Sequence, residues 1–101
     1  MKTADLEKWI SAEVRPYRLK FSLSGEQVRI PDVLTALLGS IDGHPVRFDF
    51  HGPKSVDTGA YLILIFDIRT KNEIGNASSP SGFMEALARI DWPNAIGALT
   101  H

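Results

Sequence analysis

The chain has 101 residues, of which 44% are hydrophobic and 23% charged, a composition typical of a globular domain and not of a disordered segment. At this length we expect one domain over residues 1–101. Eleven basic and twelve acidic residues give a net charge of −1, so the basic excess with which nucleic-acid-binding proteins neutralise phosphates is missing.

Cysteine is absent, which excludes a disulfide, a thiolate zinc site and a cysteine nucleophile. The first residues include the acids Asp5 and Glu7 and no apolar run, unlike a signal peptide. The longest apolar run, residues 60–66, is too short to cross a bilayer. We therefore expect a cytoplasmic protein that binds neither membrane nor nucleic acid, and no motif predicts a cofactor.

The N-terminal third of the chain predicts a helix followed by strands. Apolar residues recur at helical spacing: Leu6, Trp9, Ile10 and Val14. This pattern predicts an amphipathic helix over residues 4–14, with Thr3 as N-cap and Pro16 as its stop. Apolar and polar residues then alternate over residues 17–23, as in a half-buried strand. After a turn, residues 27–30 are expected to return as a short second strand.

The middle of the chain predicts a second helix and a strand pair. This helix is expected to begin at Pro31 and Asp32 and to end at Gly39 or Gly43. Its apolar stripe consists of Val33, Leu34, Leu37, Leu38 and Ile41. Alternation predicts a strand over residues 46–51, and a loop rich in turn formers over 52–59 leads into the most apolar strand, 60–70.

The C-terminal part contains a glycine-, asparagine- and serine-rich segment, residues 71–81, which predicts a mobile loop. A helix from Ser81 to Ile90 and a short helical turn over 94–99 follow. The order helix, strand, short strand, helix, strand, strand, helix predicts an α+β domain. We expect a mostly antiparallel sheet of three or four strands with helices packed on one face.

Strand 60–70 is apolar on both faces. If its even-numbered positions face the helices, an outer patch remains. The patch would comprise the apolar residues Tyr61, Ile63 and Ile65 and a rim that includes Arg18, Arg47 and His51. Tyrosine and arginine are enriched at protein interfaces. The patch therefore predicts a non-catalytic binding or inhibitory module that binds a protein partner or a second copy of itself as a homodimer.

The rim of this patch contains more basic than acidic residues, which favours an acidic partner surface. The alternative is that the N-terminal helix or the C-terminal segment covers Tyr61, Ile63 and Ile65 and makes the strand central and buried.

Two further alternatives rest on other residues. Asp49 and His51 occupy positions i and i+2 on one strand face, a spacing that suits a metal-dependent enzyme with a divalent ion, although a solvated strand face explains them as well. A small-ligand pocket between sheet and helices, near Trp9, Trp92 and Met84, is also compatible with the sequence.

The run Asp57-Thr58-Gly59-Ala60 resembles the active-site signature of aspartic proteases, and Ala95-Ile96-Gly97 resembles the hydrophobic–hydrophobic–glycine element that supports their active-site loop. The resemblance implies a small, homodimeric hydrolase in which Asp57 of each copy shares a proton with the other. The chain departs from the family pattern because Gly52-Pro53-Lys54-Ser55 precedes this run in place of an apolar strand, and Asp-Thr-Gly is also an ordinary turn sequence.

The segment from Gly25 to Leu34, about a tenth of the chain, resembles the strand-to-helix entry of barstar-type ribonuclease inhibitors. It implies an inhibitor or immunity protein within the binding class. The strand pair expected after Pro45 departs from that fold.

Overall fold

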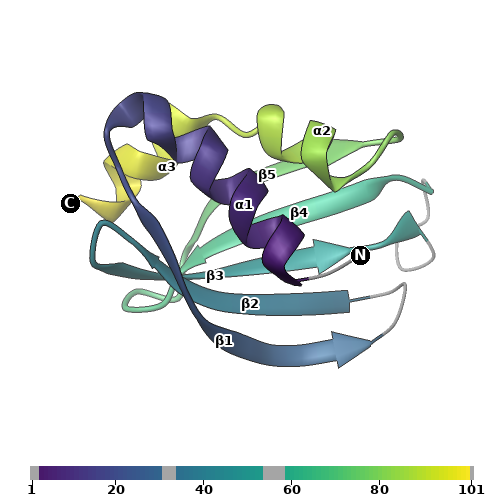
Figure 1. Cartoon of the computed structure of the whole chain (residues 1–101), viewed down its shortest axis with the longest axis horizontal. Helices are drawn as coiled ribbons and strands as arrows, with labels where there is room; N and C mark the ends of the chain where they lie inside the picture. Colours follow the sequence, from purple (N-terminus) through teal and green to yellow (C-terminus); the bar gives the residue numbers. More distant parts are fainter. Residues whose placement is uncertain (1–2, 31–33, 54–58, 101) are drawn as a thin grey trace.

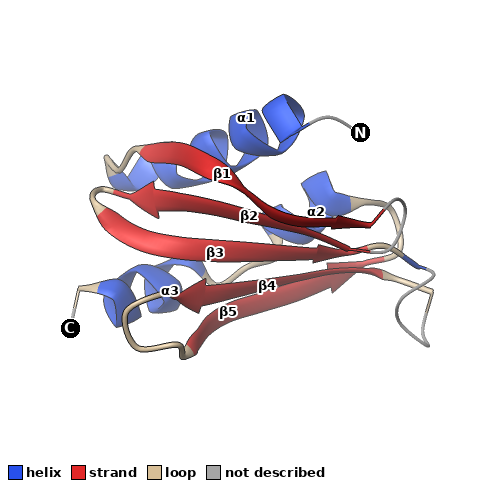
Figure 2. Cartoon of the chain, turned by 90° about the horizontal axis from the view of Figure 1, so that it is seen from below, coloured by secondary structure: helices blue, strands red, loops and turns tan. Residues whose placement is uncertain are grey.

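The computed structural model describes residues 3–30, 34–53 and 59–100, which form an antiparallel β-sheet with α-helices on one side (Figures 1 and 2). Within these residues the sheet has five strands in the order β1-β2-β3-β4-β5, so each strand pairs with its neighbour in sequence. The elements are α1 (Thr3–Val14), η1 (Arg15–Tyr17), β1 (Phe21–Ile30), β2 (Leu34–Ile41), β3 (His44–His51), β4 (Tyr61–Asp67), β5 (Glu73–Ser79), α2 (Phe83–Ala88) and α3 (Trp92–Leu99). The α+β class is confirmed, but the predicted order and number of strands are wrong.

Helix α1 packs its apolar stripe against the sheet, as the sequence predicts. Leu6, Ile10 and Val14 follow one another at four-residue spacing and are buried. Pro16 then lies in the 3-10 turn η1, which ends at Arg18 in the left-handed conformation with φ of 61°. This turn directs the chain from α1 into β1.

Strand β1 is one continuous element where the sequence predicts two strands and a turn. It pairs with β2 from Phe21 to Ile30, and the register shifts between Leu23 and Gly25 and again between Glu26 and Val28. Such bulges insert an extra residue without ending the strand. The turn expected at Ser24–Glu26 is therefore an irregular part of β1.

The prediction of a helix that begins at Pro31 and ends at Gly39 or Gly43 is wrong. Residues 31–33 lie outside the described part of the chain, and Leu34–Ile41 form β2, which pairs with both β1 and β3. The turn to β3 consists of Asp42 and Gly43, with φ of 51° and 85°. Two residues with positive φ form the tight hairpin turn that Asp-Gly favours. That turn brings β2 against β3, and sheet pairing overrides the helical spacing of the leucines.

The loop predicted over residues 71–81 is also wrong, because Glu73–Ser79 form the edge strand β5. Gly75 pairs with Ile65, and Ala77 pairs with Ile63. A Cβ at Gly75 would lie 3.4–3.5 Å from Ile65, Ala95 and Ile90. Small residues therefore let helix α3 approach the sheet here. Because these residues are not the large apolar ones that mark a strand, the sequence does not predict β5.

The even-numbered residues of β4 do not face the helices. The prediction that they do, which would leave Tyr61, Ile63 and Ile65 on the outer face, is therefore wrong. Ile63 and Ile65 are 0% exposed, and they pair with Phe50 and Phe48 on the helix-covered face. The largest fully buried apolar side chains are Phe48, Phe50, Ile10, Leu37, Ile63, Ile65, Leu87, Leu99, Val14 and Val46. The alternative in which helices cover Ile63 and Ile65 is the one observed.

Helices α2 and α3 replace the predicted C-terminal helix and helical turn at nearly the same positions. Phe83 of α2 lies against Phe50 and Tyr61, with ring centroids 5.3 and 5.0 Å apart and near-perpendicular rings. Asp91 caps α3 by accepting a hydrogen bond from the Asn94 N–H. None of the helices in the described ranges is long and apolar enough to cross a membrane.

Candidate functional site on the open face of the sheet

The helices lie on one side of the sheet, and its other side carries none of them (Figures 1 and 2). We call the outward side chains of β2, β3 and β4 on that side the open face. It consists of Ala36 and Leu38 on β2, Arg47, Asp49 and His51 on β3, and Leu62, Leu64 and Phe66 on β4. These residues point outward because side chains alternate along a strand and their neighbours Leu37, Phe48 and Ile65 are buried. Ala36, the smallest residue of the open face, is itself only 5% exposed.

A paired arginine and aspartate lie at the centre of the open face. Arg47 Nε donates to Asp49 Oδ1 at 3.0 Å, and Arg47 Nη2 donates to Asp49 Oδ2 at 3.2 Å. The two residues are two apart on β3, so their side chains share one face. The Arg47 side chain is 35% exposed and that of Asp49 15% exposed. Both charges are thus largely shielded from water and satisfied within the chain.

Apolar side chains flank this ion pair on both neighbouring strands. Phe66 lies opposite Arg47 on β4, and the guanidinium carbon lies 4.5 Å from the centre of the Phe66 ring. A cation over an aromatic ring is an attractive contact. Leu64 lies opposite Asp49 on the same strand. On the other side, Leu38 and Ala36 of β2 lie opposite Arg47 and Asp49.

The structure separates the residues of the predicted interface. Ile63 and Ile65 are buried in the core, and Tyr61 packs its ring on Phe83 of α2, on the helix side. Their predicted place on the outer face is wrong, because the cross-strand pairs with Phe50 and Phe48 turn them inward.

Of the predicted rim, Arg47 and His51 do lie on the open face, where they pair with Phe66 and Leu62 across the strands. Arg18 lies outside the sheet, at the end of η1. The apolar residues of the open face that the sequence assigned to the core are Leu62, Leu64 and Phe66. No signal within β4 could have found them, because both faces of that strand are apolar.

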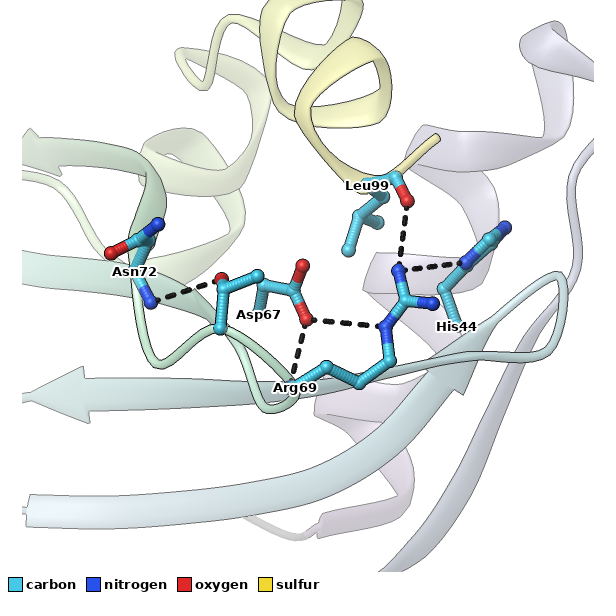
Figure 3. Close-up of polar contacts among 6 residues, drawn as sticks. His44, Asp67, Arg69, Asn72 and Leu99 are labelled. Carbon is cyan, nitrogen blue, oxygen red and sulfur yellow. Dashed lines mark hydrogen bonds and ion pairs between the residues drawn. The ribbon is translucent and has the colours of Figure 1, made fainter. Parts of the chain in front are cut away.

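A second polar cluster lies at the end of β4, beside the last turn of α3 (Figure 3). Asp67 is 2% exposed, and its Oδ1 accepts the backbone N–H of Arg69 at 2.9 Å. The Arg69 Nε lies 3.7 Å from the same oxygen, and its Nη2 donates to the Leu99 carbonyl at 3.1 Å. Nη2 also lies 3.4 Å from His44 Nδ1. These contacts join the sheet to the C-terminal end of α3.

A pocket of about 20 Å³ adjoins this cluster and is lined by residues that include Leu19, His44 and Ile96. A volume of that size holds about one water molecule. The residues near which a ligand pocket was predicted have different environments. Trp92 is buried with its indole N–H bonded to Glu13 and to the Leu87 carbonyl, whereas Met84 is 57% exposed.

The residues of the two enzyme alternatives fall in different places. Asp57 lies outside the described residues, and Ala95–Gly97 belong to helix α3. Arg47 occupies both oxygens of Asp49, the carboxylate predicted to chelate a metal with His51. In the part of the chain that the structure describes, no group of three or more histidine, aspartate or glutamate residues is arranged to hold a metal ion.

Comparison of the chain with protein-family models, with curated proteins and with solved structures gives no significant match.

Proposed function

We propose that this domain is a non-catalytic protein-binding module whose binding surface is the open face of the sheet. The observation that carries the proposal is that Leu38, Leu62, Leu64 and Phe66 surround a satisfied ion pair on the side of the sheet opposite the helices. An antiparallel sheet can leave one face in water, and the side chains on such a face are normally polar. Contiguous apolar side chains on it are typical of an interaction site.

The chemistry of the open face resembles the centre of a protein interface. Arginine and aromatic residues are enriched there, and unpaired charges are depleted. Arg47, stacked on Phe66 and paired with Asp49, fits that description. An exposed sheet face of this kind suits another protein surface better than a small molecule, which requires a concave site.

The placement of the charges does not support the acidic partner predicted from the sequence. Arg47 is neutralised by Asp49, and Arg69 turns to the Leu99 carbonyl at the end of α3. Arg18 is the C-cap residue of η1 and does not belong to the sheet. With neutral histidine the open face has no net charge, so we propose a partner surface that is apolar and electrically balanced.

The proposal is tested by the reactivity of a thiol on the open face, since the chain has no cysteine of its own. In Leu64→Cys, the new thiol would replace a half-buried side chain at the centre of the face. We expect its alkylation in cells of the source organism to be roughly tenfold slower than in dilute purified protein, when about nine-tenths of the molecules are bound. Ala98→Cys, on the exposed side of α3, is the control and should react equally fast in both.

Equal alkylation of Leu64→Cys in cells and in dilute solution would refute the binding role of the open face. Thermal unfolding of both variants, followed by circular dichroism, verifies that the comparison is made on folded protein.

A further inference from the structure

We infer that the partner of the open face is a second copy of this chain, bound face to face about a two-fold axis. The inference rests on the proposed function and specifies its partner. It depends on how the edges of the sheet are occupied, on the order of charges along β3, and on the cross-strand register of β2, β3 and β4.

Helix side chains occupy backbone groups on both edge strands, which disfavours growth of the sheet by edge pairing. On β1, the Leu23 N–H donates to the Glu7 carboxylate of α1 at 3.3 Å. On β5, the Ser78 carbonyl accepts a hydrogen bond at 3.1 Å from Nη1 of Arg89, the C-cap residue of α2. Native proteins protect their edge strands from association by such means. Two copies would therefore meet through their faces.

The charges on β3 are arranged so that the open face is complementary to itself. Arg47 and Asp49 lie on either side of Phe48 on the middle strand of the sheet. A two-fold axis in the plane of contact, running across the strands at the level of Phe48, reverses the direction of β3. Each Arg47 then lies over the other copy's Asp49. A face with one sign of charge would instead repel its own copy.

The same axis also superimposes apolar residues. The row Leu38–Arg47–Phe66 of one copy lies over the row Ala36–Asp49–Leu64 of the other, since these are the cross-strand partners in the sheet. Phe66 is thereby placed over Leu64, and Leu38 over the small side chain of Ala36. Sheets that pack face to face keep their strands within about 30° of each other, which preserves this correspondence of rows.

Burial of the ion pair in such a contact involves little further loss of hydration. Only 15% of the Asp49 side chain and 35% of the Arg47 side chain are exposed before any contact is made, and their hydrogen bonds lie within one chain. The cost of burying a charge is greatest for fully hydrated and unpaired groups. The carboxylate of the open face is thus already largely desolvated, and its arginine partner is desolvated in part.

The size of the face predicts a weak dimer. Strands about 4.8 Å apart with a rise of about 3.3 Å per residue give the three strands of the open face an area of roughly 330 Å². Two such faces remove on the order of 700 Å² from water, which is less than the roughly 1,200 Å² at which stable specific interfaces begin. We therefore expect a monomer–dimer equilibrium that depends on concentration.

Sedimentation equilibrium of the purified chain over a wide concentration range tests the inference. The wild type should pass from monomer to dimer as its concentration rises. Asp49→Arg places two arginines on the face and Arg47→Asp places two aspartates there, and each should raise the dimer dissociation constant by roughly 10- to 100-fold because like charges oppose each other twice. Lys8→Asp, which changes the charge of α1 by the same amount as Arg47→Asp, is the control and should dimerise like the wild type.

Mixing the two charge variants provides a test that loss of folding cannot mimic. Asp49→Arg and Arg47→Asp should form a heterodimer with a dissociation constant within about tenfold of the wild-type value, because opposite charges again face each other. The double variant R47D/D49R keeps both the intrachain pair and the two-fold complementarity, so it should dimerise with itself. A mixture that stays monomeric, or a double variant that does, would overturn the two-fold arrangement.

The inference and the proposed function can fail separately. A wild-type chain that stays monomeric at every concentration excludes the second copy as partner. If the Leu64→Cys thiol is nevertheless shielded in cells, the open face binds a different protein and the proposed function stands. If that thiol is not shielded either, both are wrong.

Discussion

Consecutive residues of β4 have opposite environments although their side chains are chemically similar. Ile65 is 0% exposed between the sheet and the helices, whereas Leu64 lies half-buried on the open face. Side chains alternate along a strand, so a shift of one residue decides whether a truncation leaves a closed cavity or removes surface. The two positions therefore report which face of β4 is the core.

Truncation of these neighbours should have unequal effects on stability. Ile65→Ala should lower the free energy of unfolding by about 2–5 kcal/mol, because it leaves a cavity in the core. Leu64→Ala should lower it by about 1 kcal/mol or less, since water reaches the space that the side chain vacates. Urea denaturation of the two variants at the same temperature measures the difference. A larger loss for Leu64→Ala would mean that the faces of β4 are assigned the wrong way round.

The sequence predicts the faces of β3 but not those of β4, for a physical reason. In β3, Val46, Phe48 and Phe50 alternate with polar residues, and all three are buried as expected. In β4 both the odd-numbered and the even-numbered residues are apolar. Its one clearly polar residue, Asp67, can be buried because it accepts the Arg69 N–H. Composition therefore could not show which side of β4 belongs to the candidate site.

Strand β2 depends on close contact with β1 at one glycine. An added Cβ at Gly39 would lie 2.6 Å from the Ser22 carbonyl oxygen and 2.7 Å from the Phe21 ring. Real Cβ atoms do not approach other atoms so closely, so any side chain here forces the two strands apart. Glycine at this position is thus required by the sheet. The sequence instead suggests that Gly39 ends a helix, which it does not.

Gly39→Ala distinguishes a strand from a helix by the sign of its effect. In the observed sheet it should destabilise the protein by about 1–3 kcal/mol, as overpacking does. In a helix, alanine would instead stabilise by about 1 kcal/mol relative to glycine. Thermal or urea unfolding gives the sign. Gly25→Ala on β1 is the control, because its Cβ would have no atom within 4 Å, and it should change stability far less.

The elements that the sequence predicts correctly are those whose pattern has a single explanation. Leu6, Ile10 and Val14 recur at four-residue spacing along the whole of α1, and this pattern fits only a helix. The leucines of Leu34–Ile41 fit both a short buried strand and a helix, and periodicity alone cannot separate the two. The deciding signal is the Asp42-Gly43 hairpin turn, which pairs β2 with β3 and therefore favours a strand on each side of it.

The two layers of the molecule are joined at one end by a polar contact as well as by the core. Arg69, just after β4, donates to the Leu99 carbonyl at the end of α3, while the buried Asp67 positions its backbone and lies near its guanidinium (Figure 3). The last carbonyls of a helix have no partner within the helix, and a cation near them is favourable. This contact therefore orders the end of α3 against the sheet.

Removal of that cation should loosen α3 without unfolding the domain. Arg69→Gln replaces the charged donor to Leu99 by a shorter, neutral amide, and the hydrogen bond from a charged group near the surface that is lost contributes about 1 kcal/mol net. Amide hydrogen exchange over residues 96–100 should then become roughly fivefold faster through local opening, because a free-energy change of that size acts on the opening equilibrium. Exchange in β3 should be unchanged, since that strand opens only when the core unfolds. Lys8→Gln removes an exposed charge from α1 and should leave exchange in α3 as in the wild type. Unchanged exchange at residues 96–100 in Arg69→Gln would show that the packing of Leu99 and Ala95 alone holds α3 in place.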